Sequence, residues 1–229
     1  MPCTRPVEQG AALIIVLSVL AMAGLSFALD ALLIKSTRVR DDQRAAKALA
    51  LAKEALLAYA VAQDWDNNKG RFPCPDLGNV SNYDTSGTSG ACGGDGLVSF
   101  GLLPWKSLGL PNLRDGDNAP ILYAVSGRYK MGSTLAVTGY PTSDLLTFNN
   151  ITNNNTHDYV AIVFAPGERL PTQTRVLTDT AANQRSQFLE KRYVPAVNTD
   201  FEAAQINRSA GYNDRVIGIT HNELIAATM

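Results

Sequence analysis

Few side chains in this 229-residue sequence have types and spacings suited to chemistry. The two histidines, His157 and His221, have no cysteine or second histidine at a metal-ligand spacing, so we expect them to face solvent or to make structural hydrogen bonds. There is no G-x-S-x-G motif and no P-loop, and the run from Gly93 to Gly96 is typical of a turn. These patterns predict a chain that is not an enzyme and that uses no cofactor.

Asp115 and Asp117, in the segment RDGDN, are an oxygen-rich pair that can contribute to a cation site. Calcium takes several carboxylate and carbonyl oxygens, and this pair supplies some of them. The EF-hand spacing is not met, and an Asp-Gly turn is the alternative interpretation of the same residues. We therefore expect no metal centre, with Asp115 and Asp117 as weak calcium candidates.

Cys74 and Cys92 are the cysteines that lie outside the first ten residues, which contain Cys3. They flank a long segment of turn-forming residues, and a loop of this kind usually needs a restraint within a compact domain. In an oxidising compartment, a disulfide that closes a loop of this length contributes ~3 kcal/mol. We expect a Cys74–Cys92 disulfide, and two unpaired buried thiols are the alternative.

The length and net charge of the chain limit the number of domains and the classes of partner. The 229 residues suffice for one ordinary domain and an accessory segment. The formal net charge is -1 and aromatic residues make up 7% of the chain, so a nucleic-acid partner is not indicated.

The first 34 residues hold the only long apolar run of the sequence. The stretch from Ala11 to Leu29 carries no charge, and as a helix it is roughly 28 Å long, close to the thickness of a hydrocarbon core. We therefore expect a transmembrane helix half over residues 11–34. A secretory signal cleaved after Ala23 is the alternative, because Ala21-Met22-Ala23 forms a small-x-small site.

The helix is predicted to continue beyond this run as a second half over residues 35–66. The segment DDQRAAKALALAKEALLAYAVAQDW consists mainly of strong helix formers and has no Gly or Pro. Turn and stop residues follow from Asn67 to Pro73. Steps of four and three place a narrow apolar seam on one side, which requires a packing partner. The predicted seam consists of Ala45, Leu49, Ala52, Leu56, Tyr59 and Gln63.

The remainder, residues 67–229, is predicted to be a globular α+β domain. Strand-like content occurs at 119–130, 133–139, 157–167 and 214–220, and a short helix is expected within 178–193. Thr220 and Glu223 have the spacing of a capping box that opens a last helix. Trp105 is expected to be a packed anchor rather than a ligand platform.

The junction Gln9-Gly10, followed by AALIIVLSVLAMAGL, resembles the type IV pilin and pseudopilin superfamily. The resemblance implies a prepilin-like leader over residues 1–10, cleavage after Gly10 by a prepilin peptidase, and a mature, methylated start at Ala11. The form QGAALI is most similar to minor subunits of type IV pili and type II secretion systems. Major pilins carry Glu at the fifth mature position, where this chain has Ile15, and the difference implies a tip-type minor subunit.

The resemblance also implies a fold, a location and partners. The expected fold class is α+β, with a long N-terminal helix, transmembrane in one half and periplasmic in the other, packed on a small antiparallel sheet with long loops. We expect a minor pilin-like or pseudopilin-like structural subunit in the bacterial inner membrane, single pass, with its C-terminal domain in the periplasm or on an extracellular fibre. The expected partners are other pilin-like subunits, which bind through the N-terminal helix, the inner membrane and the prepilin peptidase.

One charge pattern opposes this orientation, because Lys35, Arg38 and Arg40 follow the apolar run while the leader carries only Arg5. The alternative function is a single-pass, membrane-anchored periplasmic binding protein or enzyme of unknown substrate. A passive anchor needs neither processing at Gly10 nor an apolar seam that matches a neighbour.

We predict that Gly10→Val traps the precursor and abolishes assembly, because a prepilin-type junction needs Gly at this position. N-terminal sequencing and intact mass, from cells with and without a prepilin peptidase, provide the measurement. A peptidase-dependent start at Ala11 is expected for the unsubstituted chain. Normal assembly of the Gly10→Val chain would contradict the processing model.

Overall fold

The computed structural model describes residues 8–63, 69–92, 95, 97–137, 146–149, 156–176, 178–180, 185–189, 200–202 and 213–228. Internal contacts divide the chain into two compact units, Met1–Asp41 and Asp42–Met229. The first helix contributes residues to both units, and each unit is described by itself below. Cys3 and most of the expected leader lie outside the described residues.

Helix α1 spans Glu8–Ala62 and is 55 residues long. From Leu25 to its end it contains neither Gly nor Pro, so no residue in this stretch interrupts the backbone hydrogen bonds. The helix ends where the chain folds back: the Gly70 amide donates to the Ala60 carbonyl over 3.0 Å. Gly70 has φ +79°, a left-handed conformation in which residues with a Cβ are strained.

In the part of the chain that the structure describes, no helix has an apolar window long enough to cross a membrane. The expected transmembrane half at 11–34 is therefore wrong, and so is the single-pass inner-membrane location inferred from it. In this segment the side chains described are those of residues 13 and 15–23.

Unit Asp42–Met229 contains a six-stranded sheet with β4 at its centre. Along the main path the strand order is β1-β2-β4-β3-β5, and β6 pairs with β4. The strands are β1 (Ser99–Leu102), β2 (Leu122–Val125), β3 (Leu146–Asn149), β4 (Thr156–Ala165), β5 (Asp200–Glu202) and β6 (Arg215–Thr220).

Strand β4 is ten residues long, and three strands share its two edges. Tyr159 is paired with both Leu146 of β3 and Thr220 of β6, so β3 and β6 lie on opposite edges. All pairings of β4 are antiparallel, whereas β3 and β5 run parallel. The predicted small antiparallel sheet is therefore wrong in this respect, because β5 adds a parallel edge to a mixed sheet.

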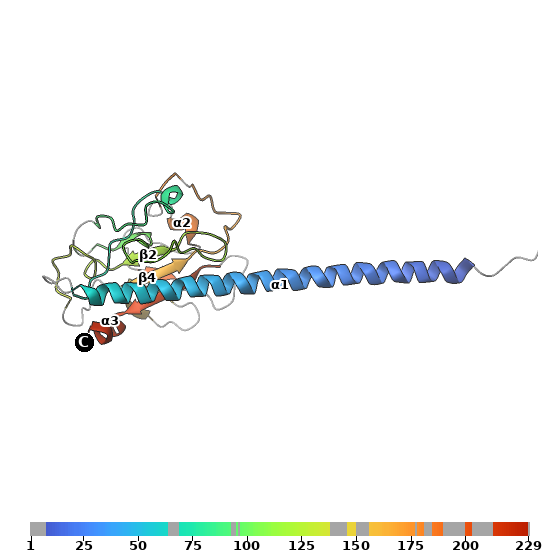
Figure 1. Cartoon of the computed structure of the whole chain (residues 1–229), viewed down its shortest axis with the longest axis horizontal. Helices are drawn as coiled ribbons and strands as arrows, with labels where there is room; N and C mark the ends of the chain where they lie inside the picture. The colour runs from blue at the N-terminus through green and yellow to red at the C-terminus, as the bar shows by residue number, and fades with distance from the viewer. Residues whose placement is uncertain are drawn as a thin grey trace, which may run out of the picture. The chain divides into compact units, whose positions relative to one another are not determined.

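One face of the sheet packs against the C-terminal part of α1 (Figure 1). Tyr123 of β2, Val163 of β4 and Ile219 of β6 belong to this core. The α1 residues of the same core are Ala45, Ala48, Leu49, Ala52, Leu56 and Ala60. The predicted seam is confirmed from Ala45 to Leu56, but Tyr59 and Gln63 are only half-buried and Ala60 takes the last position. The reason is helical period: 3.6 residues per turn drifts away from strict steps of four and three.

The opposite face of the sheet is also covered, by loops rather than by a long helix. Its core holds Phe100 of β1, Ile162 and Phe164 of β4 and Phe188 of α2 (Arg185–Phe188). Tyr83, which follows the short 3-10 helix η1 (Val80–Asn82), completes it. Both faces of β4 are thus buried, which explains its continuous apolar run.

The structure corrects several predicted elements. The expected strands at 119–130, 157–167 and 214–220 correspond to β2, β4 and β6. No strand occurs in the described part of 133–139; instead, arginine side chains hold this segment, since Arg71 donates to the Leu135 carbonyl and Arg128 to the Ala136 carbonyl. Strands β1, β3 and β5 were not predicted. Of the helix expected within 178–193, the described residues contain only the four-residue α2.

Helix α3 (His221–Thr228) opens with the predicted capping box, which is confirmed. The Thr220 amide donates to a Glu223 carboxylate oxygen over 2.9 Å, and the Glu223 amide donates to the Thr220 hydroxyl over 3.2 Å. Lys53 of α1 donates to the other Glu223 oxygen over 2.6 Å and to the Gly218 carbonyl over 2.9 Å. These contacts attach the β6–α3 junction to α1.

We predict that Leu56→Ala lowers the free energy of unfolding by about 2–5 kcal/mol. The Leu56 side chain is fully buried against the sheet, so truncation leaves a cavity. Val61→Ala, in the same helix at a position that is 42% exposed, serves as the matched control and should change stability by less than about 0.5 kcal/mol. Urea unfolding of both variants checks this, and equal effects would contradict the packing described here.

Candidate functional site

Large exposed apolar side chains cover more than half of the circumference of α1 near its N-terminus, within unit Met1–Asp41. Each is between 57% and 70% exposed. We call this set the apolar collar; it consists of Leu13, Ile15, Val16, Leu17, Val19, Leu20 and Met22.

At about 100° per residue, the members of the collar occupy roughly 220° of the circumference of the helix, and the remaining arc holds Ser18 and Ala21. Ser18, the polar residue among them, donates its hydroxyl to the Ile15 carbonyl over 2.8 Å, so its hydrogen bond is made within the helix. Seven large exposed apolar side chains on one stretch of helix form a contiguous patch, so the collar is a surface suited to contact with other molecules.

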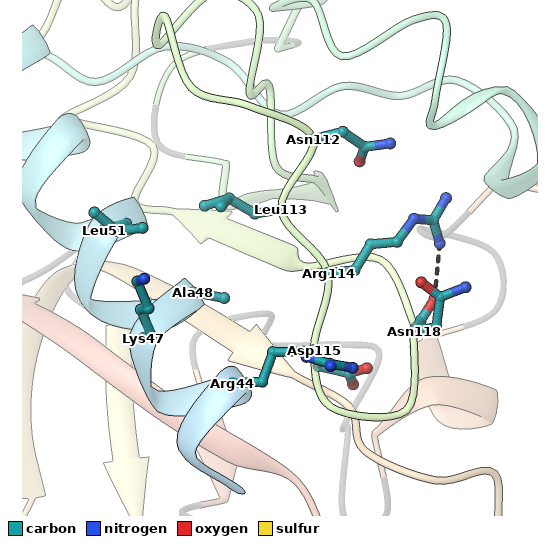
Figure 2. Close-up of a pocket in the computed structure, with 9 residues that line it drawn as sticks. All are labelled: Arg44, Lys47, Ala48, Leu51, Asn112, Leu113, Arg114, Asp115 and Asn118. Atoms are coloured by element: carbon teal, nitrogen blue, oxygen red, sulfur yellow. Dashed lines mark hydrogen bonds between the residues drawn. The ribbon is translucent and has the colours of Figure 1, made fainter. Parts of the chain in front are cut away.

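A second candidate site lies in unit Asp42–Met229, where α1 faces the loop 112–118. Here a groove of about 390 Å³ is lined by Arg44 and Lys47 of α1 and by Arg114 of the loop (Figure 2). We call it the basic groove. Its other lining residues are Ala48, Leu51, Asn112, Leu113, Asp115 and Asn118.

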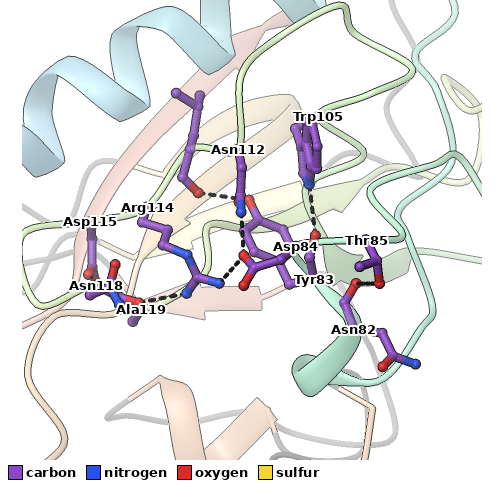
Figure 3. Close-up of polar contacts among 11 residues, drawn as sticks. Asn82, Tyr83, Asp84, Thr85, Trp105, Asn112, Arg114, Asp115, Asn118 and Ala119 are labelled. Atoms are coloured by element: carbon purple, nitrogen blue, oxygen red, sulfur yellow. Dashed lines mark hydrogen bonds and ion pairs between the residues drawn. The ribbon is translucent and has the colours of Figure 1, made fainter.

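Arg114 is held in place by a network on its loop (Figure 3). Its guanidinium forms an ion pair with Asp84 and donates to the Asn118 carbonyl over 2.8 Å. It also lies 5.3 Å from the centre of the Tyr83 ring. The hydrogen bonds from Arg114 and from Asn112 lower the pKa of the exposed Asp84 carboxyl, so Asp84 is charged at neutral pH. Arg114 is therefore fixed in place beside the groove.

The calcium candidates do not converge. Asp115 is buried, and its carboxylate accepts from the amides of Asp117, Ala119 and Gly167 over 2.7–3.0 Å. Burial raises the pKa of Asp115, and the Asp117 side chain is exposed. Oδ1 of Asp115 closes the turn, as in the Asp-Gly alternative, and Oδ2 attaches the turn to Gly167, which follows β4. The described residues contain no group of three or more acidic, His or Cys side chains suited to a metal.

Cys74 and Cys92 form a disulfide with Cα atoms 5.4 Å apart. The end of the loop that it closes also binds a buried amine: Lys130 donates to the Cys92 carbonyl over 2.6 Å, and to the carbonyl of Leu97, beyond the loop, over 2.9 Å. Burial lowers the pKa of Lys130. Sequence reasoning missed this buried lysine, because its partners are backbone carbonyls and leave no motif.

Of the two histidines, His221 has a side chain that the structure describes. His221 is buried, and its Nδ1 is hydrogen-bonded to the Tyr129 hydroxyl over 2.7 Å, so its predicted structural role is confirmed. The His157 side chain lies outside the described residues. Gly10 and Ala11 lie within α1, and cleavage between them stays a prediction.

Trp105 is a packed anchor, as predicted. It lies against the loop-covered core, and its indole N–H donates to the Tyr83 carbonyl over 2.9 Å.

The sequence does not predict the basic groove, although two cations of one helix, Arg44 and Lys47, stand at the i and i+3 spacing that places them on the same side. The sequence does not show that Arg114 lines the same groove, because the tertiary fold brings the loop 112–118 to α1.

No protein-family model, curated protein or solved structure matches this chain. The terms for pilus, secretion and membrane that the N-terminal pattern suggested therefore have no support from known proteins.

We predict that His221 makes stability depend on pH. Burial lowers its pKa below the ordinary 6.5, so the unfolded chain binds more protons as the pH falls through this range. The stability contributed by neutral His221 is therefore present above about pH 6.5 and lost as the pH falls through the folded pKa. Urea midpoints at several pH values between 5 and 7.5 measure the effect.

The matched variant is His221→Gln, which keeps a hydrogen-bonding group near Tyr129 but does not titrate. Its urea midpoint should fall less on acidification than that of the unsubstituted chain. Identical pH profiles for the two proteins would show that His221 does not contribute in this way.

Proposed function

We propose that this chain is a minor pilin-like structural subunit, whose apolar collar packs against the N-terminal helices of neighbouring subunits. The observation that carries the proposal is the collar itself: seven large apolar side chains, each more than half exposed, on one stretch of α1. Single exposed apolar residues are common on protein surfaces, but a contiguous patch of seven of them marks a contact surface.

The collar can supply enough free energy for association. Burying one large apolar side chain contributes about 1.5–3 kcal/mol, so burying the whole collar contributes on the order of 10 kcal/mol. Association costs several kcal/mol in lost translational and rotational freedom, and this gain exceeds the lower estimates of that cost. When several helices pack together, a larger part of the apolar surface of each collar is buried than when only two helices pack together.

Ile15 supports a purely apolar form of this contact. It is 62% exposed in the collar, at the position where the family resemblance expects Glu. A buried carboxylate is tolerated only with a partner charge, whereas isoleucine needs none. A subunit with Ile15 can therefore pack against apolar neighbours without a matched amino group.

Processing after Gly10 is the second part of the proposal. Cleavage there removes the polar residues that precede Ala11, and so leaves the apolar stretch at the start of the mature chain. The collar begins at Leu13, so the new N-terminus lies within one helical turn of the proposed contact surface.

We predict that Leu20→Glu weakens self-association or co-assembly of the full chain by at least tenfold, because a charge in the collar must be desolvated without a partner. Leu20 is 66% exposed, so the substitution leaves the fold of the monomer intact. Sedimentation velocity over a range of protein concentrations provides the measurement.

The matched control is Val39→Glu, a change of the same kind at an exposed position of α1 outside the collar. It should leave association unchanged. A Leu20→Glu chain that associates as tightly as the unsubstituted protein would overturn the proposal, and so would equal weakening by both substitutions.

A further inference from the structure

The basic groove has properties of a ligand site that the apolar collar does not explain. We propose that it binds an acidic segment of a partner polypeptide, through a carboxylate with a neighbouring backbone N–H. The inference is independent of the proposed function, because the lining residues belong to unit Asp42–Met229 and the collar does not.

Arg44 and Lys47 provide positive charge that the groove itself does not neutralise. They are exposed and lie at i and i+3, so they project from the same side of α1. Within the described residues, neither side chain has an ion pair with a carboxylate. Asp115 is the acidic residue of the lining, and backbone amides occupy both of its oxygens.

Arg114 brings a third cation to the lining from the loop, with its guanidinium directed away from α1 and toward Asn118 (Figure 2). Its ion pair with Asp84 and its bond to the Asn118 carbonyl fix the guanidinium, which still has N–H donors to spare. Because Arg114 is already ordered, a ligand that it contacts loses less free energy in immobilising the side chain. Arginine also suits carboxylates, since its planar fork matches their geometry.

Asn112 indicates that the ligand is more than an anion. Its amide nitrogen donates to Asp84, which fixes the direction of the side chain (Figure 3). Its Oδ1 is buried and has no hydrogen-bond partner among the described residues. A buried acceptor without a donor costs free energy, and a ligand N–H that reaches Oδ1 removes this cost.

The apolar residues of the lining favour a glutamate side chain over a compact anion such as phosphate. Ala48 and Leu51 of α1 and Leu113 of the loop also line the groove, and Ala48 and Leu113 lie between Lys47 and Arg114 in Figure 2. These side chains can pack against the methylene groups that precede a glutamate carboxylate. A carboxylate, an apolar stem and an adjacent N–H occur together in an acidic peptide.

Calorimetric titration of the full chain with the blocked peptide acetyl-Gly-Glu-Glu-Gly-amide tests the proposal. We expect saturable binding that weakens as salt is raised, because exposed charges are screened. The peptide with Gln in place of both Glu residues should bind at least tenfold more weakly, and so should a peptide N-methylated at its Glu residues. Equal binding of the Gln peptide would overturn the proposal.

The protein variants isolate the groove. Arg44→Gln combined with Lys47→Gln should weaken binding of the Glu peptide at least tenfold, because both positions lie in the lining. Arg40→Gln, an exposed cation of α1 outside the lining, should leave binding unchanged. These surface changes preserve the fold, which the urea midpoint of each variant checks.

Free glutamate distinguishes a small-molecule site from a peptide site, and it is titrated under the same conditions. Weaker binding of free glutamate than of the blocked peptide is expected, since the free amino group adds a positive charge near the cations. Tighter binding of free glutamate would overturn the peptide assignment. Failure of the collar variant to affect association has no bearing on these titrations, so the two proposals fail separately.

Discussion

The double burial of β4 is the constraint on which the described domain depends. From Val160 to Ala165 every side chain is at most 1% exposed, so both faces of the strand must be covered along its length. The C-terminal part of α1 covers one face, and loops with η1 and α2 cover the other. A register shift between Tyr159 and Ala161 places two successive residues, Val160 and Ala161, in the helix-side core, which increases its contact with α1. Each remaining strand is positioned through β4, either directly or through one neighbour.

Local patterns predicted those parts of the fold in which short-range physics dominates. The helical content of α1, its seam from Ala45 to Leu56 and the capping box at Thr220 are properties of neighbouring residues. Strands β1 and β5 are different, because they are four and three residues long and carry no periodic signal. Strand β5 exists through its parallel pairing with β3, and β1 through its pairing with β2. Pairing between distant segments is not encoded in the composition of either one.

The same division applies to the candidate sites. The collar is a contiguous stretch, so its apolar character could be seen in the sequence, but its predicted environment was wrong because hydrophobicity alone does not specify what covers it. The basic groove joins two residues of α1 to a loop far along the chain. The oxygens of the RDGDN aspartates indicate a cation site, yet Oδ1 of Asp115 orders the turn that carries Asn118 in a left-handed conformation, with φ +63°, and Oδ2 accepts from the Gly167 amide. Which donors a carboxylate meets is decided by the fold.

Ala48 has a double position, since it is buried in the core between α1 and the sheet and also lines the basic groove. The small Ala48 side chain lets α1 lie close to the sheet. The position of α1 against the sheet also determines its distance from the loop 112–118, so the packing of the core and the width of the groove depend on each other in this protein. Any sequence change that enlarges the side chain at this position alters the binding surface and the interior together, so the two can diverge in evolution only through compensating changes on the loop.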